Sequence, residues 1–289
     1  MANLKEIRTR IASVKNTQKI TKAMYLVAAA RLRKAQEAIT NMRPYAVSTM
    51  DMMGSISARV GNDESVHPLL EKREVNKVLL VVLTSDRGLA GGFNASMNKA
   101  AWKKHQELIE DGKEVRVLGI GRKGADFFGR RDANIDRTYV ETFHDASYDA
   151  AGLISDAIAK AFIDGEVDAV YLGFNEFKSA MTQIVRMDQM LPFEPDPTLA
   201  EDGGDYLYEP DQETLLGELL PLALHVQIYR ALLESLASEH GARMSAMDSA
   251  TKNAKEMIDS LTLQANRARQ AAITTELMEI ISGAESLKG

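Results

Sequence analysis

The stretch LKEIRTRIASVKNTQKITKAMYLVAAARLRKAQEAITNM, residues 4–42, carries the pattern that decides the fold. Apolar and small residues recur along it at alternating spacings of three and four, which is the period of a left-handed coiled coil. Pro44 lacks a backbone N–H and is expected to bend this helix, which should end near residues 61–63. The positions of the seam are Leu4, Ile7, Ile11, Val14, Gln18, Thr21, Tyr25, Ala28, Leu32, Ala35, Ile39 and Met42.

The C-terminal block, residues 211–289, shows the same periodicity. At about 1.5 Å per residue, about 70 helical residues span roughly 105 Å, which is wider than a compact domain of this size. Two long helices at opposite ends of one chain therefore predict an antiparallel coiled coil that projects from the domain between them. The apolar stripe of this block runs through Ile258, Leu261, Ala265, Ala268 and Ala272, and then shifts to Ile273, Leu277, Ile280, Ala284 and Leu287.

The middle of the chain alternates strand patterns with helix patterns. KVLLVVLT, residues 77–84, is a continuous apolar run of the kind found in strands that are buried on both faces. Further strands are expected at residues 114–120, 137–141, 167–174 and 182–187, with helices up to residue 110, at 123–129 and at 149–163. This order predicts an α/β, Rossmann-like domain with a largely parallel sheet.

The domain organisation that follows has three parts. We expect an N-terminal coiled-coil helix over residues 1–60, an α/β globular domain over residues 75–200, and a C-terminal coiled-coil helix over residues 210–289.

The composition excludes several classes of protein. A chain that is 45% hydrophobic and 26% charged is globular rather than disordered. The absence of cysteine excludes disulfide frameworks and thiolate metal sites. No apolar run approaches the roughly 18 residues of a membrane-spanning helix, and the N-terminal residues lack the apolar core of a signal peptide. We therefore expect a protein of the reducing cytoplasm that does not insert directly into a membrane.

Charge is unevenly distributed along the chain. Residues 1–43 carry ten basic and two acidic side chains, a net charge of +8, whereas residues 211–289 carry a net charge of −4. A basic arm on an acidic body indicates that the arm faces a negative partner. The alternative is pairing with the C-terminal block, whose charge is too small to neutralise the arm. A nucleic-acid partner is not expected, because the basic residues lack interleaved aromatic side chains.

Two glycine-rich segments resemble cofactor-binding motifs. Residues 119–124, GIGRKG, fit the dinucleotide pattern G-x-G-x-x-G, and Glu141 follows at about the distance of a ribose-binding acid. A nicotinamide dehydrogenase would bind its cofactor there. The fingerprint normally follows the first strand of the fold, however, and here it follows the second, so we interpret it as a structural turn. SDRGLAGGFN, residues 85–94, lacks the G-K-[ST] ending of a nucleotide-binding loop.

No catalytic constellation is visible in the sequence. None of the five histidines lies three or four residues from another. A scaffold or tether built on a coiled coil therefore remains an alternative to an enzyme.

The C-terminal segment ITTELMEIISGAES, residues 273–286, matches the signature of the gamma subunit of F-type ATP synthases. Residues 20–30, 85–94, 226–235 and 237–244 resemble the same family, so the resemblance covers the whole chain. The lack of an insertion in the middle domain and the lack of cysteine resemble the bacterial form. The resemblance implies a central rotor shaft, without catalytic residues or a cofactor, that couples proton-driven rotation of the c-ring to ATP synthesis or hydrolysis in the alpha/beta hexamer.

The resemblance also implies partners and contact residues. The partners are the alpha and beta subunits, the epsilon subunit and the membrane c-ring, with the chain peripheral on the cytoplasmic face of the bacterial inner membrane. Met24 would lie opposite acidic loops of beta, although Tyr25 stands where many relatives carry lysine. The remaining expected contacts are Arg269 and Gln270 with a catch loop of beta, Thr274 and Glu276 on the same helical tip, and Tyr206, Tyr208 and Glu209 near the c-ring and epsilon.

Overall fold

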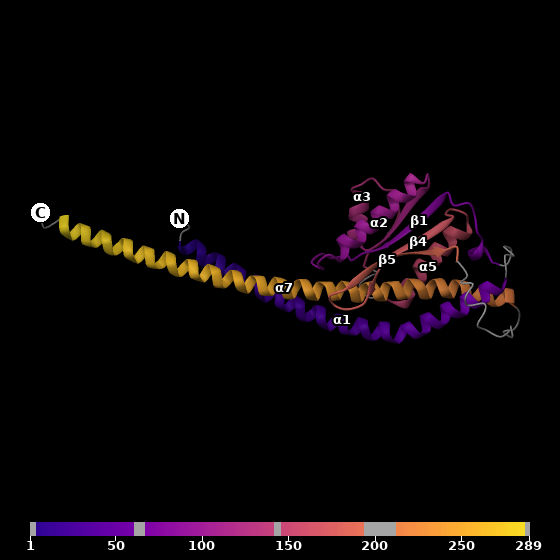
Figure 1. Ribbon diagram of the computed structural model, residues 1–289, viewed down its shortest axis with the longest axis horizontal. Helices are drawn as coiled ribbons and strands as arrows, with labels where there is room; N and C mark the ends of the chain where they lie inside the picture. The colour runs from indigo at the N-terminus through magenta and orange to yellow at the C-terminus, as the bar shows by residue number, and fades with distance from the viewer. Residues whose placement is uncertain (1–3, 61–66, 142–145, 194–211, 287–289) are drawn as a thin grey trace. The chain divides into compact units, whose positions relative to one another are not determined.

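The computed structural model describes residues 4–60, 67–141, 146–193 and 212–286. Two long helices frame the chain, α1 (Leu4–Val60) and α7 (Gln212–Ser286), and an α/β domain lies between them in sequence (Figure 1). The contacts divide the chain into two compact units. We call residues 1–27 with 244–289 the helical unit, and residues 28–243 the α/β unit.

The α/β unit contains a five-stranded sheet with the order β3-β2-β1-β4-β5. The first four strands in chain order are parallel to one another, and β5 is antiparallel to β4. The largely parallel sheet expected from the sequence is therefore confirmed. The strands are β1 (Lys77–Leu83), β2 (Glu114–Ile120), β3 (Ile135–Tyr139), β4 (Ala169–Phe177) and β5 (Gln183–Leu191).

Helices cover both faces of this sheet. The connections through α2 (Phe93–Glu110) and α3 (Arg122–Gly129) move along the sheet from β1 toward β3, whereas α5 (Tyr148–Ile163) returns to β4 beyond β1. Because such crossovers are right-handed, opposite directions place α5 on the other face from α2 and α3. Figure 1 shows α2 and α3 together on one side of the sheet. A short 3-10 helix, η1 (Pro68–Leu70), precedes β1.

The core of the α/β unit is built around β1, whose residues after Lys77 are all buried. On one face, Val78, Leu80 and Val82 pack with Met97 of α2 and Phe128 of α3. Since side chains alternate between the faces of a strand, a run that is apolar at every position suits a strand covered on both sides.

In the α/β unit, α1 and α7 run antiparallel. Arg43 pairs with Glu234 and Met50 accepts a hydrogen bond from Gln227, so α7 numbering falls as α1 numbering rises. The predicted seam is buried on α1 at Ala28, Leu32, Ala35 and Ile39, and burial continues beyond it at Ala46 and Met53. Pro44 lies inside α1 and does not end it. The long antiparallel coiled coil predicted with the α/β domain is confirmed.

The helical unit packs through a thin seam. Ile7 and Thr21 of α1 are buried, as are Met247, Ala254 and Leu261 of α7. The hydroxyl oxygens of Thr21 and Thr251 are 2.8 Å apart and share a hydrogen bond. Residues 271–284 of α7 are all exposed in the chain.

Several strand boundaries differ from the expected ones, and the fifth strand ends at Leu191 rather than at residue 187. The third strand lies at Ile135–Tyr139 rather than 137–141, because Glu141 has a left-handed φ of 66° that a strand cannot contain. The fourth runs to Phe177 rather than 174, because β5 pairs with it that far. The three domain ranges inferred from the sequence stay a prediction. Among the described residues, no helix is long and apolar enough to cross a bilayer.

Candidate functional site

The N-terminus of α3, where a dinucleotide phosphate would bind, is occupied by oxygen atoms of the chain itself. The amide of Arg122 donates to Asp86 Oδ1 (2.9 Å), that of Lys123 to the Ser85 carbonyl (3.1 Å), and that of Gly124 to Thr84 Oγ1 (2.8 Å). A phosphate at a helix N-terminus is bound through such free amides. Here the three N–H groups are already paired, so the motif has no free donors at this position.

The glycines of this motif allow the turn after β2 to pack closely against Thr84, the residue that follows β1. A Cβ at Gly121 would lie 2.0 Å from the Thr84 carbonyl oxygen, and Gly121 has a φ of 96°. A Cβ at Gly124 would lie 2.9 Å from Thr84 Oγ1. The backbone amide of Glu141, the residue in the ribose position, donates to Asp86 Oδ2 at 3.1 Å. The interpretation of residues 119–124 as a structural turn is confirmed.

The second place where an α/β sheet binds ligands is also filled. Such sites lie at the carboxyl ends of the strands where the strand order reverses, here between β1 and β4. Ser235 and Ser238 of α7 hydrogen-bond to the backbone of Asn175 in β4. Arg243, paired with Glu239, donates to the carbonyl of Gly88 in the loop after β1 at 3.2 Å. Helix α7 therefore occupies the position that a ligand takes in related architectures.

The glycine-rich loop after β1 is organised by its own hydrogen bonds. The backbone amide of Ser85 donates to Asn94 Oδ1 at 2.9 Å, and the Ser85 hydroxyl donates to the Arg87 carbonyl at 2.6 Å. Leu89 adopts a left-handed φ of 62° with its side chain 64% exposed. The loop therefore holds its shape without a phosphate.

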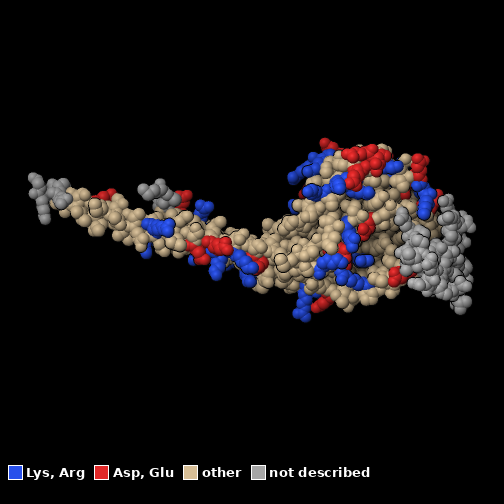
Figure 2. Space-filling view, in the orientation of Figure 1, with Lys and Arg blue, Asp and Glu red and all other residues tan. Residues whose placement is uncertain are grey.

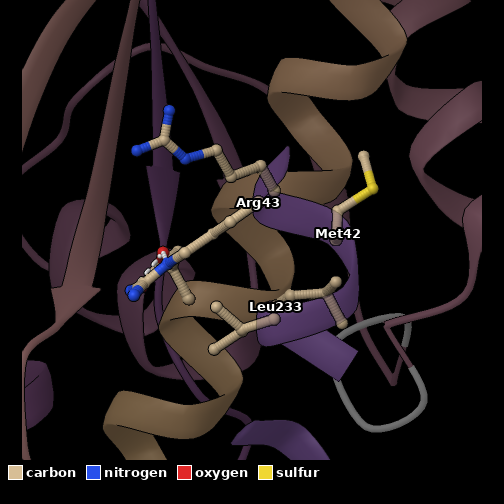
Figure 3. Close-up of a pocket in the computed structure, with 6 residues that line it drawn as sticks. Met42, Arg43 and Leu233 are labelled. Carbon is tan, nitrogen blue, oxygen red and sulfur yellow. Dashed lines mark hydrogen bonds and ion pairs between the residues drawn. The ribbon is translucent and has the colours of Figure 1, made fainter. Parts of the chain in front are cut away.

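A small cleft between α1 and α7 offers no ligand site either. It has an empty volume of about 140 Å³ but admits no water-sized molecule. Figure 3 shows Met42 and Arg43 of α1 beside Leu233 of α7, with the hydrogen bonds from Arg43 to Glu234 dashed. The cleft is a gap in the helix packing.

Metal-binding and proton-transfer groups do not gather in the part of the chain that the structure describes. No group of three His, Cys, Asp or Glu side chains is placed to hold a metal ion there. His105 is buried and stacked on Trp102, with ring centroids 5.0 Å apart, and burial lowers its pKa. His225 stacks on Tyr148 at 3.9 Å. Both histidines have packing roles.

Ion pairs account for the lowered pKa values of two carboxylates, Glu176 in β4 and Glu71 before β1. Glu176 is bonded to Lys178 and Arg186, and these cations lower its pKa despite the opposing effect of burial. Arg73 lowers the pKa of Glu71 in the same way. Neither of these two carboxylates combines a raised pKa with a cleft, the combination expected of a general acid.

The expected beta-contact residues lie on the helical unit. Met24 is half-buried on α1. Arg269, Gln270, Thr274 and Glu276 are all exposed on α7, and the Thr274 hydroxyl donates to the Gln270 carbonyl at 2.9 Å. Tyr206, Tyr208 and Glu209 fall outside the described residues. The four α7 side chains are therefore available to a partner, whereas Met24 is partly covered within the chain.

The largest feature of the helical unit is its exposed apolar surface. Near the C-terminus five large apolar side chains are between 47% and 69% exposed: Ile273, Leu277, Met278, Ile280 and Ile281. Figure 2 shows that this part of the chain carries few charged groups on the face in view. A contiguous apolar surface of this kind marks an interaction site in a soluble protein.

Sequence reasoning missed a second apolar group on α1. Ile20, Leu26 and Val27 are 60%, 57% and 54% exposed, more than Met24. The heptad pattern assigns only the face of α1 that packs in the seam, whereas residues 20–30 are apolar on several faces. Apolar residues outside the seam positions were the signal that identifies this surface.

Basic side chains accompany this apolar group on α1. Lys15, Lys19 and Lys22 are exposed, and Lys22 Nζ lies 4.6 Å from the centroid of the Tyr25 ring. The helical unit thus combines positive charge with exposed apolar surface, which suits an acidic partner with apolar contacts.

Comparisons with known proteins agree on one family. Residues 3–287 match the family model described as ATP synthase. The chain is 50% identical to an "ATP synthase gamma chain" of Geotalea daltonii and 52% identical to that of Geobacter metallireducens, with the whole of both chains covered in each case.

A solved structure gives the same result. The chain resembles one from the central stalk and c-ring of the Tetrahymena thermophila mitochondrial ATP synthase, with 27% identity and a TM-score of 0.62. The match covers 80% of this chain and 99% of the other. Family and architecture therefore coincide: the chain belongs to the gamma-chain family of bacterial F-type ATP synthases, and the central rotor shaft expected from its sequence is confirmed as its role.

Proposed function

We propose that this chain is a non-catalytic subunit that carries the rotation of a membrane c-ring into the alpha/beta hexamer from the cytoplasmic face of the bacterial inner membrane. The exposed apolar end of α7 is the observation that carries the proposal. The fourteen residues 271–284 are all exposed, and only Glu276 and Glu279 among them are charged. Apolar surface left in water is unfavourable by about 25 cal/mol per Å². A surrounding sleeve of alpha and beta subunits removes that surface from water.

The chemistry of such a sleeve suits rotation. Apolar contacts are nondirectional, so the side chains from Ile273 to Ile281 gain nearly the same free energy at every rotor angle. Directional groups beside them favour particular angles. We assign that role to Arg269, Gln270, Thr274 and Glu276, facing beta.

The other proposed contacts follow the charge of the chain. Met24, with Lys19 and Lys22 nearby, faces acidic loops of beta, which supply the negative partner of the basic arm. Tyr206, Tyr208 and Glu209 form the contact with the c-ring and epsilon at the foot. No cofactor takes part, in keeping with the paired amides at the N-terminus of α3.

Truncation after Ala272 tests the function. The removed residues up to Ala284 are exposed in the chain, so the α/β unit should keep its circular dichroism, and its free energy of unfolding should change by no more than about 0.5 kcal/mol. The complex with alpha and beta should lose thermal stability, because the truncated helix no longer stabilises it by binding. An equal thermal stability of the full-length and truncated complexes contradicts the enclosed tip. Loss of the sheet signal in the truncated chain alone contradicts the independence of the α/β unit.

A further inference from the structure

The end of β4 is paired differently on its two sides. Pairing with β1 stops at Gly173, while pairing with β5 continues to Phe177. The backbone groups of Asn175 and Phe177 therefore need partners beyond β1. Buried main-chain groups are almost always paired. Other atoms must therefore bond the backbone of β4 beyond Gly173, where β1 no longer does.

One face of α7 supplies these partners. The amide of Asn175 donates to Ser235 Oγ (3.1 Å), and its carbonyl accepts from Ser238 Oγ (3.1 Å). The amide of Phe177 donates to Glu234 Oε2 at 2.8 Å. All three α7 side chains are fully buried. They lie within one turn of the helix, and α7 thus continues the edge of the sheet where β1 ends.

Helix α1 completes the arrangement through Arg43. Its guanidinium donates to Glu234 Oε1 through Nη2 (2.8 Å) and Nε (3.0 Å), and Nη2 also donates to the Phe177 carbonyl (3.1 Å). We call Arg43, Glu234, Ser235 and Ser238, with the backbone of Asn175 and Phe177, the polar clamp. Glu234 is its centre, because its two oxygens bind α1 and β4 respectively.

A glycine lets α7 approach this closely. A Cβ at Gly241, seven residues after Glu234 on the same helix face, would lie 3.1 Å from Ala180 Cα and 3.3 Å from the Phe177 ring. The backbone of α7 therefore packs directly on the chain that follows β4. Direct backbone packing leaves little freedom for the helix to slide over the sheet.

We propose that the polar clamp is the joint through which the rotor passes load between the α/β sheet and the helices α1 and α7. This rests on the rotor function given above. Directional hydrogen bonds to a backbone fix both translation and rotation of a helix, which apolar packing alone does less strictly. If the hydrogen bonds of the polar clamp break under load, part of each rotation step deforms the α/β unit and is not passed on to the partner subunits.

The test uses the full chain in a complex reconstituted with alpha, beta, epsilon and c-ring in vesicles. The main variant combines Ser235→Ala and Ser238→Ala, which unpairs both backbone groups of Asn175 and adds no strain to a helix. Amide hydrogen exchange at Asn175 should accelerate about tenfold or more, because a buried donor has lost its acceptor. Protons pumped per ATP hydrolysed against an opposing gradient should fall, with the complex still assembled.

Glu234→Gln provides a second variant if the first fails to fold. It removes the negative charge that faces Arg43 while keeping a side chain of the same length. Exchange at Phe177 should accelerate, and pumping per ATP should fall in the same assay. Faster exchange at Asn175 or Phe177 with unchanged pumping per ATP under load overturns the proposed joint.

Asp136→Ala is the matched control. Asp136 pairs with Arg116 at 2.9 Å across β2 and β3, in the same sheet but outside the clamp. It should leave exchange at Asn175 and pumping per ATP unchanged. An equal loss of pumping in this variant overturns the clamp in favour of general destabilisation. Failure of the wild-type chain to restore pumping to a gamma-less complex overturns the rotor assignment and the clamp with it.

Discussion

Thr21 and Thr251, 230 residues apart in sequence, place their hydroxyl oxygens 2.8 Å from each other in the seam of the helical unit. Each hydroxyl also lies within hydrogen-bond distance of a carbonyl of its own helix, that of Gln18 (3.1 Å) or of Met247 (2.7 Å). Since each hydroxyl has one proton, one threonine donates across the seam and the other donates within its helix. A polar pair in an apolar seam fixes the register of the two helices.

Removing one member of this pair should cost more than removing both. We expect Thr21→Val to lower the stability of the helical unit by about 1 kcal/mol, because the Thr251 hydroxyl loses its cross-seam partner. The double variant with Thr251→Val should be close to wild type or more stable, since an apolar pair replaces the polar one. Thermal unfolding followed by far-ultraviolet circular dichroism measures both. A double variant less stable than the single variant contradicts this account.

Gly121→Ala should destabilise the α/β unit without altering nucleotide binding. The new Cβ would meet the Thr84 carbonyl oxygen at 2.0 Å, and alanine is strained at a φ of 96°. Clash and strain together should cost about 3 kcal/mol or more. Gly217→Ala is the control, because a Cβ there meets nothing within 4 Å inside helix α7, and alanine should add about 0.5–1 kcal/mol of stability.

Calorimetry with magnesium-ATP completes that experiment. The wild-type chain should show no tight binding, because the amides at the N-terminus of α3 are already paired. Micromolar binding that disappears in Gly121→Ala contradicts the structural role of the loop.

Stability should depend on pH through His105. Burial lowers its pKa in the folded chain below the ordinary value of 6.5, so the unfolded chain binds the proton more readily. The contribution is therefore fully present above pH 6.5 and is lost as the pH falls below it toward the folded pKa. Denaturant midpoints at pH 7.5 and pH 5.5, followed by the fluorescence of Trp102, the one tryptophan, should show lower stability at pH 5.5.

His105→Phe should reduce this pH dependence while keeping an aromatic ring beside Trp102. Part of the dependence should remain, because burial also lowers the pKa of His67. The acid-side effects of Glu71 and Glu176, whose pKa values are lowered, act below their ordinary value of 4.5 and leave this window unaffected. An unchanged difference between the two pH values in His105→Phe contradicts the assignment.

Met24→Lys should impair coupling while the complex still assembles. The added ammonium would form an ion pair with an acidic beta loop at particular rotor angles, and that pair must break on every turn. Such a pair contributes about 1 kcal/mol when exposed and more when partly buried, and about 1.4 kcal/mol is a tenfold change in rate. Proton pumping and ATP hydrolysis in vesicles, at low and high salt, measure the effect.

Asn16→Lys is the matched control for that experiment. It adds the same charge to an exposed position of α1 two turns earlier. Its pumping per ATP should equal that of the wild type. Equal pumping by wild type and Met24→Lys at both salt concentrations would remove Met24 from the proposed contact.

The sequence predicted those features that depend on local periodicity. Leu32 and Ile39 are buried because the heptad spacing puts them on one face of α1, and residues 77–83 form a strand because every position is apolar. The extension of β4 to Phe177 was not predictable in this way. It depends on pairing with β5, and on the other side of the strand Ser235 and Glu234, about 60 residues further along the chain, bond the backbone of Asn175 and Phe177.

The features of the candidate site also fall into those that local sequence spacing predicts and those that it does not. The apolar positions near the C-terminus, Ile273, Leu277 and Ile280, follow from the helical spacing of the sequence. The pairing of Asp86 with the amides of Arg122 and Glu141 was not visible, because no spacing rule connects an aspartate after one strand with the turns after two others. Exposed Leu26 and Val27 were overlooked because a seam pattern assigns only the inward face.

The oxygens of Thr84, Ser85 and Asp86 that close the N-terminus of α3 have a mechanical consequence. A mononucleotide-type fold whose anion position is filled from within has the same internal bonds whatever the concentrations of ATP, ADP and phosphate around it. The stiffness of the α/β unit should therefore not change with the nucleotide concentration. The elastic energy that the rotor stores at a given twist should then be the same at low and at high ATP.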